Sequence, residues 1–452
     1  MALVITTLHS LAAVAVSPSR SLVGVDSQRV LSTLRYGVVT TSDPDPEALL
    51  SGRAAAELGR EEVTVSLAFG QLTRGDAAGT RVLIKEYRAD QTPQTPTEIA
   101  RAQLEGSLGG APPGGLDQLE ALFASDGRSA ASIAAAMAEN EFAAHLRLQP
   151  PGGSDEAYGY RGKLSKLLGQ ESPEPGTIRM VFPWYGEVTR MALPTRTPPT
   201  LATWLDLHAR GETLSAKVEA NIPGRTCQLR GEYARGALST ALLGLTRLHE
   251  AALTHGSLGA SAVLVSSEDD RKGASGGKGR LLDLAFARDL RSLEPASRVG
   301  GDGALLPLLA DRPDPLATDL RERAARAGAA EEGAFGTADD MRAFGVLLLQ
   351  AMVEPNAERG AFPLARLLQL IDGPFAASSR ASADGAVDVD GLRDYLAADD
   401  ACRRGGYGGV ELLDSAGGAG WSLVASLLGP YAERPSAAAA LGHPFWSAGL
   451  LR

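Results

Sequence analysis

The chain has 452 residues, 44% of them hydrophobic and 22% charged, which is typical of folded globular proteins and unlike disordered chains. Its formal net charge of −10 and the lack of a basic run argue against a nucleic-acid-binding protein, because phosphate contacts need clustered lysine and arginine. No uninterrupted stretch of 18 apolar residues predicts a membrane span, and two cysteines are too few for a disulfide framework or a cysteine-rich metal site.

We interpret residues 1–58 as an N-terminal extension. Residues 1–25 contain no acidic side chain and are rich in serine, threonine and alanine, while Arg20 is followed by Arg29 and Arg35. This composition resembles that of an organelle transit peptide. Two interpretations stay open: a chloroplast or mitochondrial targeting segment, or a disordered tail on a cytoplasmic protein.

The first expected strand begins near Glu61, where apolar and polar residues alternate with a period of two. A second expected strand covers residues 81–87, which are rich in β-branched and aromatic side chains. Glycine and polar residues at positions 75–80 supply a turn between them. The sequence therefore predicts a β-hairpin.

A helix is predicted over residues 130–148, which are rich in alanine, contain no glycine or proline, and end before Pro150. Residues 177–182 form another expected strand, and a proline-rich connector follows at 183–199. We place a boundary in this connector, between a strand-rich part at 59–185 and a helical part at 186–448. The predicted fold class is α+β.

The helical part is predicted from its apolar spacing. Helices are expected from Leu201 onward, along an apolar stripe between Tyr233 and Leu248, and over the mostly apolar residues 342–353. Polar loops rich in small residues are expected at 269–279 and 377–386.

Residues 248–265 carry the most informative pattern: a helix ends in a tight loop of small residues that leads directly into a strand. Residues 280–285 then predict a second short strand with Asp283 at its end. We interpret this arrangement as a site flanked by a hairpin.

These segments resemble the catalytic loop H-R-D-L-K-P-x-N and the D-F-G strand of protein kinases. His255 and Leu258 match the histidine and leucine of the loop, and Asp283 matches the aspartate of D-F-G. Lys85 matches the lysine of the V-A-I-K strand, and Glu141 on the next helix is the candidate for its ion-pair partner. The resemblance, to a degenerate member of plant or algal type, implies a fold of two lobes over residues 61–446.

Further landmarks of the family follow in the same order. Asp340 opens a segment similar to D-x-W-S-x-G-V, and the resemblance implies that its carboxylate bonds the backbone of the catalytic loop. Arg434 is expected to pair with Asp314, which lies in a segment similar to A-P-E. Similar segments also occur at residues 201–205, 312–314, 434–435 and 443–446.

The departures from the family decide the predicted activity. Ser257 replaces the catalytic aspartate, and a serine hydroxyl cannot accept a proton near neutral pH as a carboxylate does. Gly259 replaces the loop lysine, Ala262 the magnesium-binding asparagine, and Gly256 the arginine of H-R-D. We therefore predict no catalytic residue at His255, Ser257, Gly259 or Ala262.

The resemblance implies that the glycine-rich phosphate loop is also altered, because Val65 and Leu67 stand at its first two glycine positions and only Gly70 remains. The hypothesis is a pseudokinase that binds ATP and Mg²⁺ weakly at most and acts as a scaffold or allosteric partner of an unknown protein. The residues expected to contact the nucleotide are Gly70, Lys85, Glu141 and Asp283, with Asp283 as the metal ligand.

Two other functions stay open. One is an active serine/threonine kinase that uses Glu268, Asp269 or Asp270 as a substitute carboxylate, and the other is a structural interaction protein whose cleft is filled by Val65 and Leu67. Individual residues also have simpler interpretations. Lys85 could be an ordinary strand lysine, Glu141 (like its neighbour Glu139) a solvated helix residue, and His255 a buried structural imidazole.

Overall fold

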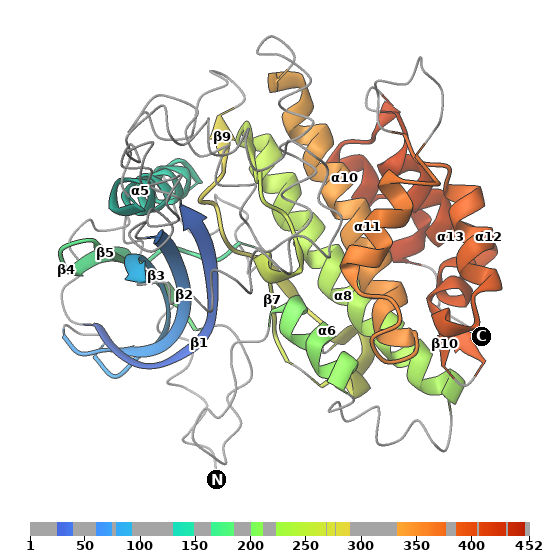
Figure 1. The fold of residues 1–452 in the computed structure, drawn as a ribbon, viewed down its shortest axis with the longest axis horizontal. Coiled ribbons are helices and arrows are strands. Elements are labelled where there is room, and N and C mark those ends of the chain that lie inside the picture. Colours follow the sequence, from blue (N-terminus) through green and yellow to red (C-terminus); the bar gives the residue numbers. More distant parts are fainter. Residues whose placement is uncertain are drawn as a thin grey trace, which may run out of the picture.

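The fold is taken from a computed structural model that describes residues 25–38, 60–74, 78–92, 130–148, 164–184, 200–210, 223–267, 269–275, 277–289, 332–376, 386–404, 406–430 and 433–447. Within these ranges the protein is of the α+β class, with one small antiparallel sheet and several helices (Figure 1). This confirms the predicted class.

The main sheet has five antiparallel strands in the order β1-β2-β3-β5-β4. Their bounds are Val25–Val38 for β1, Arg60–Leu72 for β2, Arg81–Thr92 for β3, Gly169–Glu174 for β4 and Thr177–Pro183 for β5. The predicted hairpin of β2 and β3 and the predicted strand β5 are confirmed.

The prediction that ordered structure starts near Glu61 is wrong. Strand β1 lies in the stretch interpreted as an N-terminal extension, and it pairs with β2 from Val25 opposite Leu72 to Val38 opposite Glu61. It supplies the hydrogen-bond partners along the side of β2 that faces away from β3, which would otherwise be a free sheet edge. Residues 1–24, where a transit peptide was considered, lie outside the described residues.

Helix α5, Ala130–Leu148, has the predicted bounds and packs against β2, β3 and β5. Its inward stripe includes Ala134, Met137 and Ala138, spaced as neighbours on one helix face and buried against the sheet. The same apolar cluster includes Leu83 of β3 and Leu264 of the helical part, so it joins the sheet to the rest of the molecule.

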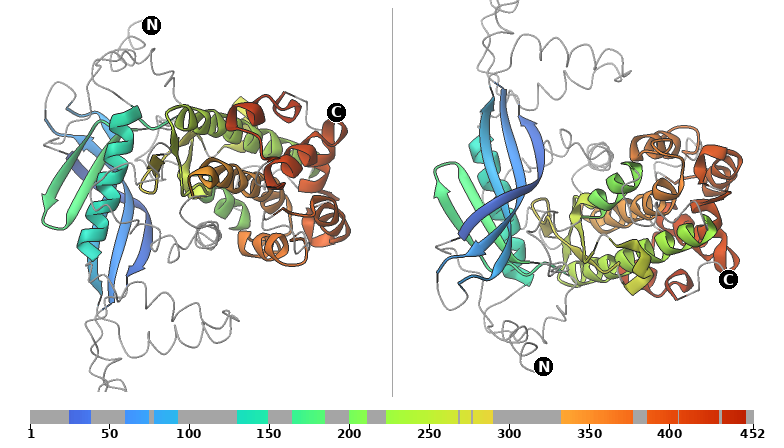
Figure 2. Two further views of the ribbon diagram at one scale, coloured as in Figure 1. Left: turned by 90° about the horizontal axis from the view of Figure 1, so that it is seen from above. Right: turned by 90° about the horizontal axis from the view of Figure 1, so that it is seen from below.

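Most helices lie on the other side of the molecule from the sheet (Figures 1 and 2). Helices α10 and α13 pack against each other and against α8 around a second, larger apolar core. The helix bounds are Leu201–Arg210 for α6, Pro223–Glu250 for α8, Glu332–Val353 for α10, Leu364–Asp372 for α11, Val389–Ala398 for α12, Gly409–Leu428 for α13 and Ala437–Leu441 for α14.

Two short hairpins follow α8. Strand β6 (Leu253–Thr254) pairs with β9 (Arg288–Asp289), and β7 (Val263–Val265) pairs with β8 (Gly279–Leu281). The predicted sequence of helix, loop and strand after residue 248 is therefore confirmed. A third short hairpin joins β10 (Arg403–Arg404) to β11 (Tyr407–Gly408).

Several predicted connectors fall outside the described residues: 185–199, the segment 312–314 and most of the loop at 377–386. Among the residues that the structure describes, no helix combines the length and the apolar character needed to cross a membrane.

Candidate functional site

Three charged side chains from distant parts of the sequence meet between the sheet and the helical part. Lys85 Nζ on β3 lies 2.5 Å from Glu141 Oε2 on α5 and 2.7 Å from Asp283 Oδ1 in the loop after β8. The residues are 2%, 0% and 5% exposed, respectively. Lys85 and Glu141 are therefore neither a solvent-facing strand lysine nor a solvated helix glutamate.

Burial opposes the charged form of Lys85 and is the largest single influence on its pKa. The charges and hydrogen bonds of Asp283 and Glu141 act in the opposite direction, and together they raise the pKa of Lys85 above its ordinary value of 10.5. Lys85 is therefore a cation at neutral pH. The cluster then holds one positive charge and two carboxylates in a buried setting.

Tyr87 is a further member of the site that the sequence analysis missed. It lies two residues after Lys85 on β3, so both side chains project from the same face of the strand. Its hydroxyl donates to Glu141 Oε2, the oxygen that Lys85 contacts, and Lys85 Nζ lies 4.8 Å from the centre of its ring. A tyrosine in a strand is ordinary, so nothing in the sequence distinguished this one.

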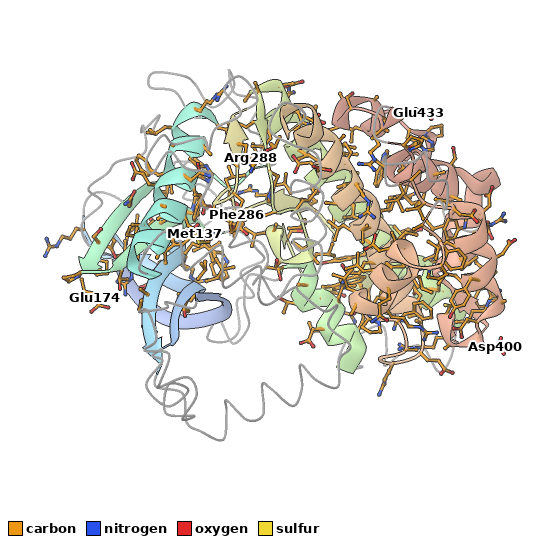
Figure 3. All side chains as sticks on the ribbon, turned by 45° about the horizontal axis from the view of Figure 1, so that its top comes forward. Met137, Glu174, Phe286, Arg288, Asp400 and Glu433 are labelled. Atoms are coloured by element: carbon orange, nitrogen blue, oxygen red, sulfur yellow. The ribbon has the colours of Figure 1, made fainter. Side chains whose placement is uncertain are left out.

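Asn140 links α5 to the segment that follows Asp283. Its side-chain amide donates to the carbonyl oxygens of Ala285 and Ala287, at 2.8 and 2.9 Å. Met137 of α5 and Phe286 of this segment belong to one apolar cluster and lie close together in Figure 3. The segment is thus held by α5 through both polar and apolar contacts.

The loop at residues 255–257 is held by Asp340 of α10. The Asp340 carboxylate accepts from the backbone N–H of His255 at 2.7 Å and of Gly256 at 3.0 Å, and it lies 3.0 Å from His249 Nε2. This confirms the backbone contact that the resemblance implied for Asp340. His255 is completely buried, and its Nε2 lies 3.0 Å from the carbonyl oxygen of Leu282. These contacts fit the structural role considered for His255.

Ser257 lies next to the backbone of Asp283. Its hydroxyl is 3.3 Å from the Asp283 carbonyl oxygen and 3.4 Å from His255 Nδ1, and the residue is 1% exposed. Asp283 itself has a φ angle of +73°, a strained conformation of the kind that clusters at functional sites. A hydroxyl at this position donates hydrogen bonds but has no carboxylate to serve as a general base.

Gly256 has a φ angle of +70°, which favours glycine. A Cβ atom there would lie 2.3 Å from the carbonyl oxygen of Phe286, so the packing also excludes a side chain. Ala262 is fully buried and its carbonyl accepts from the N–H of Leu282 at 2.9 Å. Gly259 is buried and precedes a short 3-10 helix, Ala260–Ala262.

The assignment of Gly70, Val65 and Leu67 to a phosphate loop is wrong. All three lie inside strand β2, where Gly70 pairs with Ser27 of β1 and Val82 of β3. Val65 and Leu67 are buried in the cluster that packs under α5.

The proposed substitute carboxylates are engaged elsewhere. Asp269 contacts Arg271, with Asp269 Oδ1 2.9 Å from Arg271 Nε, and the fully buried Asp270 has its Oδ2 3.2 Å from His208 Nε2 on α6. Asp270 belongs to a 3-10 segment, Asp270–Ser275, that packs against α8. Glu268 lies outside the described residues.

Arg434 donates to the carbonyl oxygens of Gly429 and Ala338, at 3.0 and 3.1 Å. Asp314, its expected partner, lies outside the described residues.

The sequence predicts Asp283 as a metal ligand. Among the residues that the structure describes, no group of three histidine, cysteine or acidic side chains is suited to hold a metal ion. One carboxylate oxygen of Asp283 already contacts Lys85. A magnesium ion at this carboxylate would have to share it with Lys85.

Comparison of the sequence with protein-family models and with curated proteins found no match.

Proposed function

We propose that the chain is a protein-kinase-like protein without phosphotransfer activity, which acts as a scaffold or allosteric partner of another protein. The observation that carries the proposal is the contact of Lys85 with both Glu141 and Asp283, because the family resemblance assigns these three residues to one site. In this proposal strand β1 and residues 59–185 form the small lobe, and residues 186–448 form the large lobe of a kinase fold.

The absence of transfer follows from the residue beside Asp283. Loss of a general base costs on the order of 10²-fold to 10⁴-fold in rate. Gly259 and Ala262 remove the further cation and magnesium ligand that stabilise the transferred phosphoryl group in the family. Asp269 and Asp270 do not compensate, because Asp269 pairs with Arg271 within its own loop and Asp270 contacts His208 of α6.

Nucleotide binding is proposed to be weak at most. A triphosphate would have to reach Lys85, which is only 2% exposed, and it would compete with Glu141 and Asp283 for the Lys85 ammonium group. An adenine ring would also have to separate an apolar cluster that runs from Leu83 on β3 to Leu264 on β7. These features favour the scaffold role over a catalytic one.

The decisive experiment measures transfer and binding on the same full-length protein. In a radiolabel assay with ATP, Mg²⁺ and a general protein substrate, we expect no transfer above a no-enzyme control. In a thermal-shift titration we expect little stabilisation, since ligand at a concentration equal to its Kd contributes only about 0.4 kcal/mol.

Lys85→Met is the control variant for both assays. Robust phosphoryl transfer that disappears in Lys85→Met would contradict the proposal, because it would demand a working base. A large ATP-dependent shift without transfer would leave the absence of catalysis standing and correct the proposed weakness of nucleotide binding.

A further inference from the structure

We propose that α5 is locked in a single position by its own side chains, so that the contacts of Lys85 with Glu141 and Asp283 persist whether or not a ligand is bound. The inference goes beyond the proposed function, since it concerns a conformational device and not the chemistry of the site. Two separate sets of hydrogen bonds carry it, one to the sheet and one to the segment after Asp283.

The first set fixes α5 to strand β3. Glu141 Oε2 accepts from both Lys85 and Tyr87, so the strand supplies two donors to one carboxylate oxygen. Glu141 is fully buried and continues the inward stripe of Ala134, Met137 and Ala138 at helical spacing. Both donors belong to the protein, so the carboxylate requires no ligand to be satisfied at this oxygen.

The second set fixes α5 to the segment after β8. Asn140 uses both N–H groups of its amide on the carbonyl oxygens of Ala285 and Ala287. That segment is held at its two ends as well, by the pairing of β8 with β7 and of β9 with β6. A shift of α5 would therefore break hydrogen bonds on two sides and expose an apolar stripe.

A shift of α5 away from this position would need both sets of hydrogen bonds to break, and each buried hydrogen bond lowers the population of such a shifted state. Loss of a hydrogen bond to a charged group typically changes an equilibrium by about 10-fold to 100-fold. With both sets of hydrogen bonds intact, a state in which α5 has shifted away from the sheet is rarely populated. The protein then presents one constant surface around α5 to any partner.

Hydrogen exchange of the full chain, followed peptide by peptide, tests the lock. We expect α5 amides of the ligand-free wild type to be as protected as those of β3, and ATP with Mg²⁺ to leave them unchanged. Tyr87→Phe and Asn140→Ala should each accelerate exchange in α5 by about 10-fold to 100-fold. The acceleration should be local, with α10 and α13 unaffected.

Matched controls are available in the helical part. The Tyr233 hydroxyl donates to the carbonyl oxygen of Ser267, and the side-chain amide of Asn356 donates to the carbonyl oxygen of Met352. Both hydrogen bonds are buried and lie away from α5. Tyr233→Phe and Asn356→Ala make the same side-chain changes, remove a buried hydrogen bond to a backbone carbonyl oxygen, and should leave α5 exchange unchanged.

Three results would overturn the inference: wild-type rates in both α5 variants, equal acceleration of α5 in the control variants, or strong protection of wild-type α5 that appears only with nucleotide. None of them bears on phosphoryl transfer, so failure of the lock and failure of the proposed function are distinguishable.

Discussion

Replacement of Lys85 by methionine removes the ammonium group that contacts both Glu141 and Asp283. The thioether fills a similar volume, but the two buried carboxylates lose the cation that lies between them. Breaking a buried ion pair by removing one partner costs about 3 to 5 kcal/mol, and folded domains are stable by only about 5 to 15 kcal/mol. We therefore expect Lys85→Met to lose a large share of the stability of the protein.

Urea unfolding followed by circular dichroism measures this loss. A matched control is Lys278→Met, because Lys278 is exposed and surface substitutions usually change stability by less than about 0.5 kcal/mol. The expected result is a marked fall in the urea midpoint for Lys85→Met and almost none for Lys278→Met.

The stability difference between wild type and Lys85→Met should also depend on pH in the alkaline range, and urea unfolding at several pH values tests this. The pKa of Lys85 is raised above 10.5 in the fold by Asp283 and Glu141, against the opposing effect of burial. The unfolded chain therefore releases this proton first, and the stability due to Lys85 is complete below pH 10.5 and declines as pH rises through the folded pKa. The difference between wild type and Lys85→Met should shrink in that range. Equal stability of the two proteins at neutral pH would refute the reasoning.

Three further perturbations follow from the site and its surroundings. Ser257→Asp should not restore phosphoryl transfer in the radiolabel assay, because Gly259 and Ala262 still lack the family's cation and metal ligand, and restored transfer would contradict this explanation. Burial is the main cause that lowers the pKa of His208 to about 4, and the neighbouring Asp270 only partly offsets it. The unfolded chain therefore binds the proton first as pH falls from 6.5 to about 4, so wild type should lose roughly 3 kcal/mol in this window. His208→Gln should flatten that slope in pH-dependent urea unfolding, and an unchanged slope would rule out His208 as its source. Gly256→Ala should lower the unfolding temperature by several degrees, as expected for a loss above ~1 kcal/mol, because its Cβ would meet the Phe286 carbonyl oxygen at 2.3 Å. A melting temperature equal to that of wild type would show that this carbonyl can move freely.

Local patterns predicted most elements of the sheet and of the site. Helix α5 has the predicted bounds because residues 130–148 combine strong helix formers with a proline just beyond the end. The hairpin of β2 and β3 followed from alternation and a glycine-containing turn. The spacing of apolar residues depends only on residues close together in the sequence. It therefore predicts helix α5 and the β2–β3 hairpin without information on the elements that pack against them.

Strand β1 could not be recognised in this way. Its residues Val25–Val38 mix polar and charged side chains with apolar ones, and its pairing with β2 spans a long connection. The missing strand then shifted the assignment of the phosphate loop to Gly70, which lies inside β2. A single missed pairing was thus enough to misplace a residue of the candidate site.

The convergence of Lys85, Glu141 and Asp283 was expected only through the family resemblance, because the three residues are far apart in the sequence. The contributions of Tyr87 and Asn140 could not be foreseen. An aromatic residue in a strand and an asparagine in a helix are common, and their hydrogen bonds depend on how α5 sits against the sheet.

The left-handed backbone of Gly256 has a consequence for any attempt to rebuild an active enzyme. The family's arginine cannot be reinstated there alone, because its first side-chain carbon would collide with the main chain at Phe286. The opposing peptide would have to retreat first, and Asn140 holds that peptide's neighbours, Ala285 and Ala287, by their carbonyl oxygens. A larger residue at position 256 therefore requires a coordinated change in at least two segments, the loop itself and the segment that contains Phe286.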